Sequence, residues 1–99
     1  MGFYEIRFSP KATHELEEAY EWYEEQLTGL GSRLVKEVDK YLSAISKNPK
    51  LFQVRFPDEI RAVPLKIFPY LVVYWIDEMN LNVIVLAIFH TKRHPSNTL

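Results

Sequence analysis

The chain has 99 residues, 47% hydrophobic and 25% charged, which predicts one globular domain over residues 1–99 and excludes long disorder. It has no cysteine, so disulfides and thiolate zinc sites are excluded, and a net charge of -1 gives no electrostatic indication of a nucleic-acid partner. No stretch is apolar enough for a secretion signal or a membrane span, so we expect a cytoplasmic protein with no membrane partner.

A strand and a helix are predicted first. Residues 3–8 (FYEIRF) alternate apolar and polar side chains, which is typical of a half-buried strand. Ser9 can cap a helix and Pro10 suits its first turn, so we expect a helix from Pro10 to Leu27. Its apolar residues recur at three- and four-residue steps and form a buried face.

The polar side of this first helix carries six glutamates, which we interpret as a solvated face: Glu15, Glu17, Glu18, Glu21, Glu24 and Glu25. Trp22 lies off the apolar stripe by about 100° of helical rotation. It is therefore a candidate for a partner interface, with a half-buried flank of the core as the structural alternative.

A second amphipathic helix is predicted from Ser32 to Lys47, after a glycine-containing turn, so the two helices should form an antiparallel hairpin. Residues 48–58 show no clear period and are expected to be irregular. Strands are then predicted over residues 59–67, 70–76 and 82–89, with Pro64 confined to an edge or a bulge.

The predicted fold is α+β, in the order β-α-α-β-β-β, with the helical hairpin on one face of an antiparallel sheet of about four strands. We expect the largely buried residues to be Tyr20, Tyr23, Leu34, Val38, Leu42, Val72, Tyr74, Val85 and Ala87.

The end of the last strand carries the clearest candidate site. His90, Lys92, Arg93 and His94 follow one another where that strand leaves the core, and such groups can hold a phosphate or a carboxylate. Arg61 and Lys66 are the other cations in an otherwise apolar segment. The alternative to a role in the site is that each only extends its charged end into water. There is no glycine-rich phosphate loop or metal-ligand pair, so no cofactor or metal is expected.

Several of these residues match a known family pattern. Arg61 opens a strand, Phe68-Pro69-Tyr70 precedes an aliphatic strand that contains Tyr74, and the last strand closes in His90, Arg93 and Pro95. Together with the opening FSPKATHELEEAYEWYEE, this resembles the RelE/ParE superfamily of bacterial type II toxin–antitoxin systems, in particular its ParE-like, plasmid-stabilisation branch.

The resemblance implies a RelE/ParE-like fold and a toxin that is neutralised by a cognate antitoxin encoded beside it, often as two toxins with two antitoxins. A ParE-like toxin inhibits DNA gyrase, and a RelE-like toxin is a metal-independent endoribonuclease that cleaves mRNA on the ribosome. A domain that binds the antitoxin without toxicity is a further alternative. The target-binding candidates are Arg61, Lys66, Tyr70, His90, Lys92, Arg93 and His94, and among them His90, Arg93 and Arg61 are the candidates for catalysis.

We favour gyrase inhibition over RNA cleavage. A ribonuclease needs a base, an acid and phosphate-binding cations in one site. Here the segment before Arg61 offers only Lys50 and Arg55, and a chain of net charge -1 gains little electrostatic attraction to the ribosome.

Overall fold

The computed structural model describes residues 3–92 and has the predicted α+β architecture. No helix in this part of the chain is both long and apolar enough to cross a membrane. In chain order the elements are β1 (Glu5–Phe8), α1 (Pro10–Gln26), α2 (Leu30–Lys47), a short 3-10 helix η1 (Pro49–Leu51), β2 (Val54–Phe56), β3 (Ile60–Pro64), β4 (Tyr70–Asp77) and β5 (Asn82–His90).

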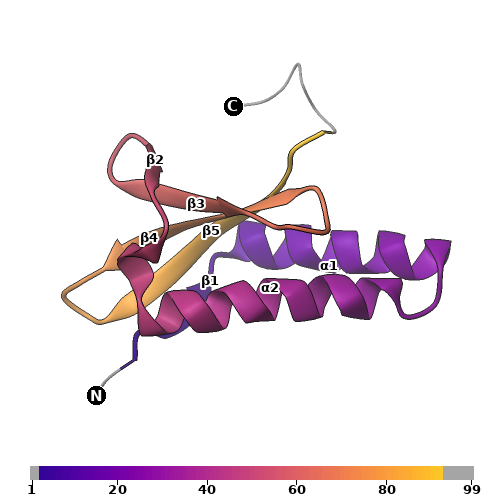
Figure 1. The fold of residues 1–99 in the computed structure, drawn as a ribbon, viewed down its shortest axis with the longest axis horizontal. Coiled ribbons are helices and arrows are strands. Elements are labelled where there is room, and N and C mark those ends of the chain that lie inside the picture. Colours follow the sequence, from indigo (N-terminus) through magenta and orange to yellow (C-terminus); the bar gives the residue numbers. More distant parts are fainter. Residues whose placement is uncertain (1–2, 93–99) are drawn as a thin grey trace.

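The strands form one sheet in the order β1-β5-β4-β3-β2, and both helices lie on the same face of it (Figure 1). β3, β4 and β5 pair antiparallel, as predicted, whereas β1 pairs in parallel with β5, which makes the sheet mixed. β2 lies within the segment that we expected to be irregular, so the sheet has five strands. Because β2 pairs only with the start of β3, Pro64 lies at an open edge, where its missing N–H costs no ladder bond.

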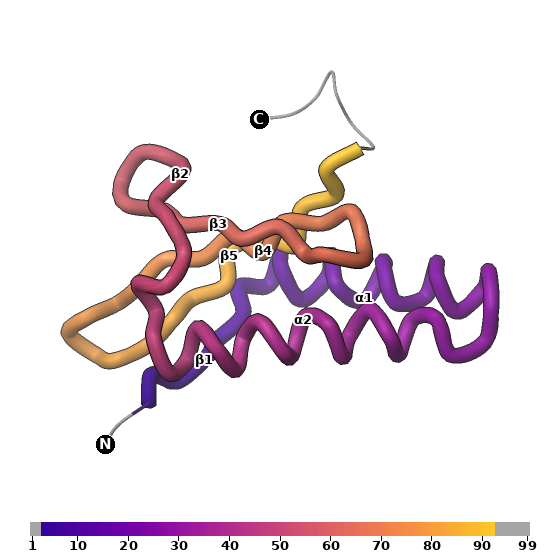
Figure 2. The backbone as a smooth tube through the Cα atoms, viewed as in Figure 1, coloured from indigo at the N-terminus to yellow at the C-terminus, as the bar shows by residue number. Residues whose placement is uncertain are grey.

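The helical hairpin is closed by local hydrogen bonds and a close helix contact. The Ser9 hydroxyl accepts the Ala12 N–H at 3.0 Å, which is the predicted cap of α1. At the other end, the Glu24 carboxylate accepts the N–H groups of Gly29 and Ser32. A Cβ on Gly31 would lie 2.5 Å from the Tyr20 carbonyl oxygen, so the helices approach closely there. The tip of the hairpin extends beyond the β3–β4 turn (Figure 2).

The core lies between the sheet and the helices, and most of its predicted members are confirmed. Those that are buried as expected are Leu34, Val38, Leu42, Val72, Tyr74 and Val85. The prediction is wrong for Tyr20, which is 38% exposed, and Tyr23 is only partly buried.

Ala87 is the other error, and its cause is a β-bulge in β5. Val73 pairs with Ala87 and Tyr74 with Val85, so Leu86 is an extra residue in β5. An extra residue reverses the alternation of side chains beyond it. As a result Ile88 enters the core at 2% exposure, and Ala87 lies on the opposite face, half-buried.

Candidate functional site

Two predicted target-binding residues, Tyr70 and His90, lie directly opposite each other where β4 begins and β5 ends. Their rings meet edge to face, with centroids 4.9 Å apart. The exit of β5 is fastened to the turn before β4, because the Thr91 N–H donates to the Pro69 carbonyl at 2.9 Å. The Lys92 N–H donates to Nδ1 of His90 at 3.1 Å, which fixes the orientation of the imidazole.

The same two residues line a hollow of about 240 Å³ together with Trp22 and Tyr23 of α1. Tyr23 contacts the rings of Trp22, Phe68 and Tyr70 at centroid distances of 4.9, 5.0 and 6.4 Å. The predicted partner-interface residue, Trp22, is 50% exposed and therefore forms an open wall of this hollow. The structure thus brings a predicted partner residue and two predicted target residues into one aromatic site.

Arg61 lies elsewhere. Its strand partner is Tyr74 of β4. Tyr74 is four residues from Tyr70, so Arg61 lies about 13 Å along the sheet from the aromatic site. Its guanidinium donates from Nη1 to the Phe52 carbonyl at 2.7 Å, and its Nε is buried without a partner. Burial raises the pKa of Tyr74, while the nearby charge of Arg61 lowers it by a smaller amount. Arg61 is therefore half-buried against the backbone, and a role for it in target binding stays a prediction.

The remaining predicted cations are not gathered into a cluster with Arg61. Lys66 is exposed in the β3–β4 turn, and Lys92 is exposed beyond the end of β5. Arg93 and His94 lie outside the described residues. Within residues 3–92, no three acidic or histidine side chains come together in a way that could hold a metal ion.

The face of the sheet opposite the helices is largely apolar along its three central strands. Tyr70, Val72 and Tyr74 face the core, so the alternate residues of β4 point to the open face. Trp75 is 40% exposed there. Arg61 is the only lysine or arginine in β3, β4 and β5, and its strand partner is Tyr74. Arg61 nevertheless lines a small hollow beside Trp75, together with Lys50, Glu59, Ile76 and Glu78. The half-buried neighbours of Trp75 on the open face are Leu71, Val73, Ile84, Ala87 and Phe89.

A larger groove, of about 710 Å³, lies along the helical hairpin. Its apolar lining includes Phe8 of β1, Tyr20 of α1 and Val35 of α2, while Glu17 and Glu21 contribute carboxylates. Tyr20, which we expected in the core, therefore belongs to a surface groove. An amphipathic segment with basic residues beside its apolar face would match this lining.

Three glutamates hold the frame of the site, a role that the sequence analysis missed. Glu15 Oε1 accepts the Ile88 N–H at 2.9 Å, beyond the point where β1 stops pairing with β5. Glu24 caps the hairpin tip, and Glu37, which is 8% exposed, accepts three N–H groups of the β3–β4 turn. For Glu37 a signal was available, because it lies three residues after Leu34 and four before Tyr41, on the predicted apolar face of the second helix.

Comparison with known proteins gives one family and several structures. The family model described as the ParE toxin of type II toxin–antitoxin systems, parDE, matches residues 6–95. No curated protein matches the sequence. In the chromosomal ParDE system from P. aeruginosa, a chain superposes with a TM-score of 0.77 at 13% identity, over 91% of this chain and 98% of that one.

Two E. coli structures are also similar. The isolated RelE toxin gives a TM-score of 0.71 at 20% identity, over 91% of this chain and 86% of that chain. A chain of the intact RelBE toxin–antitoxin complex gives a TM-score of 0.72 at 20% identity, over 91% of this chain and 99% of that chain. At such identities the likeness of the structures shows the shared fold alone.

Proposed function

The chain belongs to the ParE toxin family of type II toxin–antitoxin systems, and from this membership we propose that it inhibits DNA gyrase by binding to it. A cognate antitoxin neutralises it. The proposal includes a single domain over residues 1–99, a cytoplasmic location and an assembly of two toxins with two antitoxins.

The observation that carries the gyrase proposal is the open face of the sheet. A surface with an exposed tryptophan among half-buried aliphatic side chains suits a protein partner, since interface centres are rich in aromatic residues and poor in charge. RNA would instead require cations to bind its phosphates. Lys50 and Arg61 line a small hollow beside Trp75, but Glu59 and Glu78 line it too, and Lys50 pairs with Glu78 at 3.5 Å. Arg7, in the edge strand β1, already pairs with Glu5 at 3.5 Å.

The ribonuclease alternative requires a base, an acid and phosphate-binding cations within reach of one another. His90 is a suitable proton-transfer group by type, but the described cations are dispersed around it. Arg61 is several residues away along the sheet and is turned towards the Phe52 carbonyl. This dispersal favours binding over catalysis.

We propose the groove on the helical hairpin as the place where the antitoxin docks. Its apolar lining and its two glutamates fit an amphipathic segment that carries lysine or arginine beside its apolar face. The groove lies on the helical layer, whereas Trp75 lies on the open face of the sheet, so antitoxin and target would use different surfaces.

One preparation of the protein, assayed in two ways, tests the function. We expect inhibition of gyrase supercoiling and no ribosome-dependent cleavage of mRNA, with the inhibition removed by the product of the neighbouring gene. Cleavage without gyrase inhibition would establish the ribonuclease alternative. Inactivity in both assays, together with tight antitoxin binding, would establish a domain that only binds the antitoxin.

A further inference from the structure

The aromatic hollow at the end of β4 and β5 has the properties of a receptor for one planar side chain. Its lining residues are all aromatic: Trp22, Tyr23, Tyr70 and His90. Its volume of about 240 Å³ is below the roughly 300 Å³ at which pockets for drug-sized ligands begin, so it suits a single side chain. Trp22 and Tyr23 meet at an interplanar angle of 89°, and Tyr70 and His90 at 83°, so neighbouring walls stand nearly perpendicular.

Three of the four walls of this hollow are held by contacts within the fold. Tyr70 is 3% exposed, and Tyr23 rests on Phe68, whose N–H is held by the Glu37 carboxylate. On the other side, the Lys92 N–H fixes His90. A partner would therefore lose little free energy in ordering the site, which favours a specific occupant.

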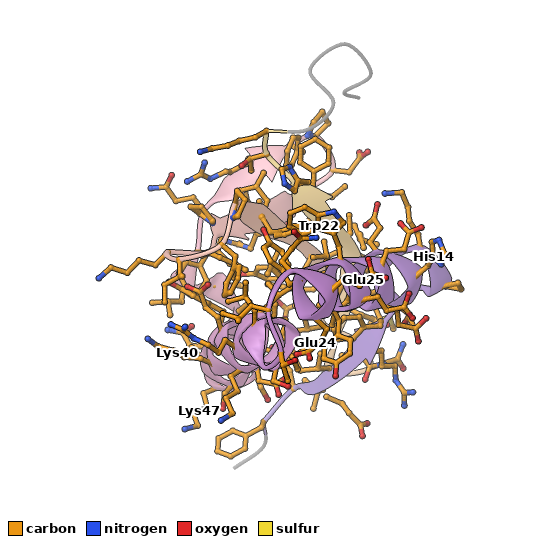
Figure 3. All side chains as sticks on the ribbon, turned by 90° about the vertical axis from the view of Figure 1, so that its right-hand side faces the viewer. His14, Trp22, Glu24, Glu25, Lys40 and Lys47 are labelled. Atoms are coloured by element: carbon orange, nitrogen blue, oxygen red, sulfur yellow. The ribbon has the colours of Figure 1, made fainter. Side chains whose placement is uncertain are left out.

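The charge beside the hollow is negative on the side of α1. Glu18 and Glu25 lie four residues before and three residues after Trp22, so both are its neighbours on the helix surface. Both are exposed, and Glu18 also contacts His14 Nε2 at 3.1 Å. Figure 3 shows Trp22 and Glu25 on α1, while Lys40 and Lys47 extend from α2 on the side away from α1. The exposed aromatic rings also present electron-rich faces, to which cations are attracted.

We infer that the hollow receives one arginine side chain of the antitoxin, an inference that rests on the proposed toxin–antitoxin function. A guanidinium is planar, so it can stack on Trp22 while its N–H groups reach the carboxylates of Glu18 or Glu25. A lysine ammonium has no plane to stack and retains its water more strongly. The same helix carries Glu17 and Glu21 in the groove, so one basic segment of the antitoxin could bind along both flanks of α1.

The test uses the whole chain and short peptides of one residue type, followed by ¹⁵N NMR of the Trp22 indole. An acetylated, amidated hexa-arginine should shift this signal with a dissociation constant at or below about 1 mM, and hexa-lysine should bind at least about five-fold more weakly. Trp22→Leu, followed through backbone amides, should weaken hexa-arginine binding by about five-fold or more. The matched control is Trp75→Leu, which changes the other exposed tryptophan and should leave the affinity unchanged.

Glu18→Gln/Glu25→Gln should also weaken hexa-arginine binding, and the effect should shrink in high salt. If hexa-arginine and hexa-lysine bind equally well, or if Trp22→Leu keeps full affinity for hexa-arginine, binding reflects only general attraction to an acidic helix. Either result would overturn the inference. Binding of single-stranded oligouridylate at Trp22, in place of hexa-arginine, would also overturn it. The titration contains neither gyrase nor antitoxin, so a failure to bind hexa-arginine says nothing about gyrase. A negative supercoiling assay would instead contradict the gyrase proposal.

Discussion

The Glu37 carboxylate of α2 accepts the backbone N–H of Lys66 at 2.8 Å, across 29 positions of sequence. Ile67 and Phe68 donate to the same carboxylate at 2.9 and 3.2 Å. One buried side chain therefore holds the β3–β4 turn on the helical layer, and with it Phe68, which supports the aromatic hollow. The hollow depends on a contact between the two layers of the fold.

Replacing Glu37 should destabilise the whole domain. Glu37→Ala leaves three N–H groups of the turn without their acceptor, and because hydrogen bonds to a charged group are strong, we expect the free energy of unfolding to fall by about 3 kcal/mol. Urea denaturation measures this change. Asp39→Ala, which removes an exposed carboxylate from the same helix, is the control and should change stability by less than about 0.5 kcal/mol. A similar small loss for both variants would contradict a structural role for Glu37.

Arg61 should contribute to stability, unlike the exposed cations. Arg61→Ala removes the donor to the Phe52 carbonyl and the packing of a half-buried side chain, so we expect a loss of about 2 kcal/mol. Lys66→Ala, at an exposed position, should have almost no effect on unfolding. Toxicity assays of Arg61 variants must therefore be corrected for the amount of folded protein. An unfolding midpoint equal to that of the unmodified chain would show that the contact with Phe52 is dispensable.

Tyr74 should make stability fall at alkaline pH. Burial raises the pKa of its hydroxyl above the ordinary value of 10.0, and the hydroxyl donates to the Pro49 carbonyl at 2.7 Å. Above pH 10 the unfolded chain releases this proton more readily than the folded chain, so the stabilisation is fully present below that pH and is lost as pH rises through the folded pKa. The contribution is isolated as the difference in unfolding free energy between the unmodified chain and Tyr74→Phe, measured from pH 8 to 11. A difference that stays constant over this range would be the contrary result.

The sequence predicts both helices, and the order of the elements apart from β2, because these depend on local patterns. For the first helix the patterns are the Ser9 cap, Pro10 and the three- and four-residue spacing of apolar side chains. The sequence does not predict the parallel pairing of β1 with β5, since Phe8 and Val85 are brought together only by the complete fold. Ile88 is buried in place of Ala87 because of the bulge in β5. The alternation of residues in the sequence does not reveal a bulge in advance.

For the site, helical position made Trp22 a candidate and the end of the last strand made His90 one, whereas Tyr70 was a candidate only through the family resemblance. Their roles in binding stay predictions. Their meeting in one hollow was not predictable, since it requires α1 to lie beside the end of β5. Arg61 was a candidate for the same site because of its charge and because of the family resemblance. Strand register places it opposite Tyr74 instead, where its half-buried guanidinium binds backbone.

The last prediction separates the two proposed surfaces. Trp75 is exposed on the open sheet face and Tyr20 in the groove of the helical hairpin, so truncating each should affect a different partner. Trp75→Ala should weaken gyrase inhibition by roughly thirty-fold, as expected for a central aromatic contact, and leave antitoxin affinity within about two-fold. Tyr20→Ala should weaken antitoxin binding by about ten-fold and leave gyrase inhibition intact. Both residues are at least one-third exposed, so both variants should fold, which thermal unfolding verifies. If Trp75→Ala inhibits gyrase as well as the unmodified chain does, the open face is not the gyrase-binding surface, and the proposal loses the observation that carries it.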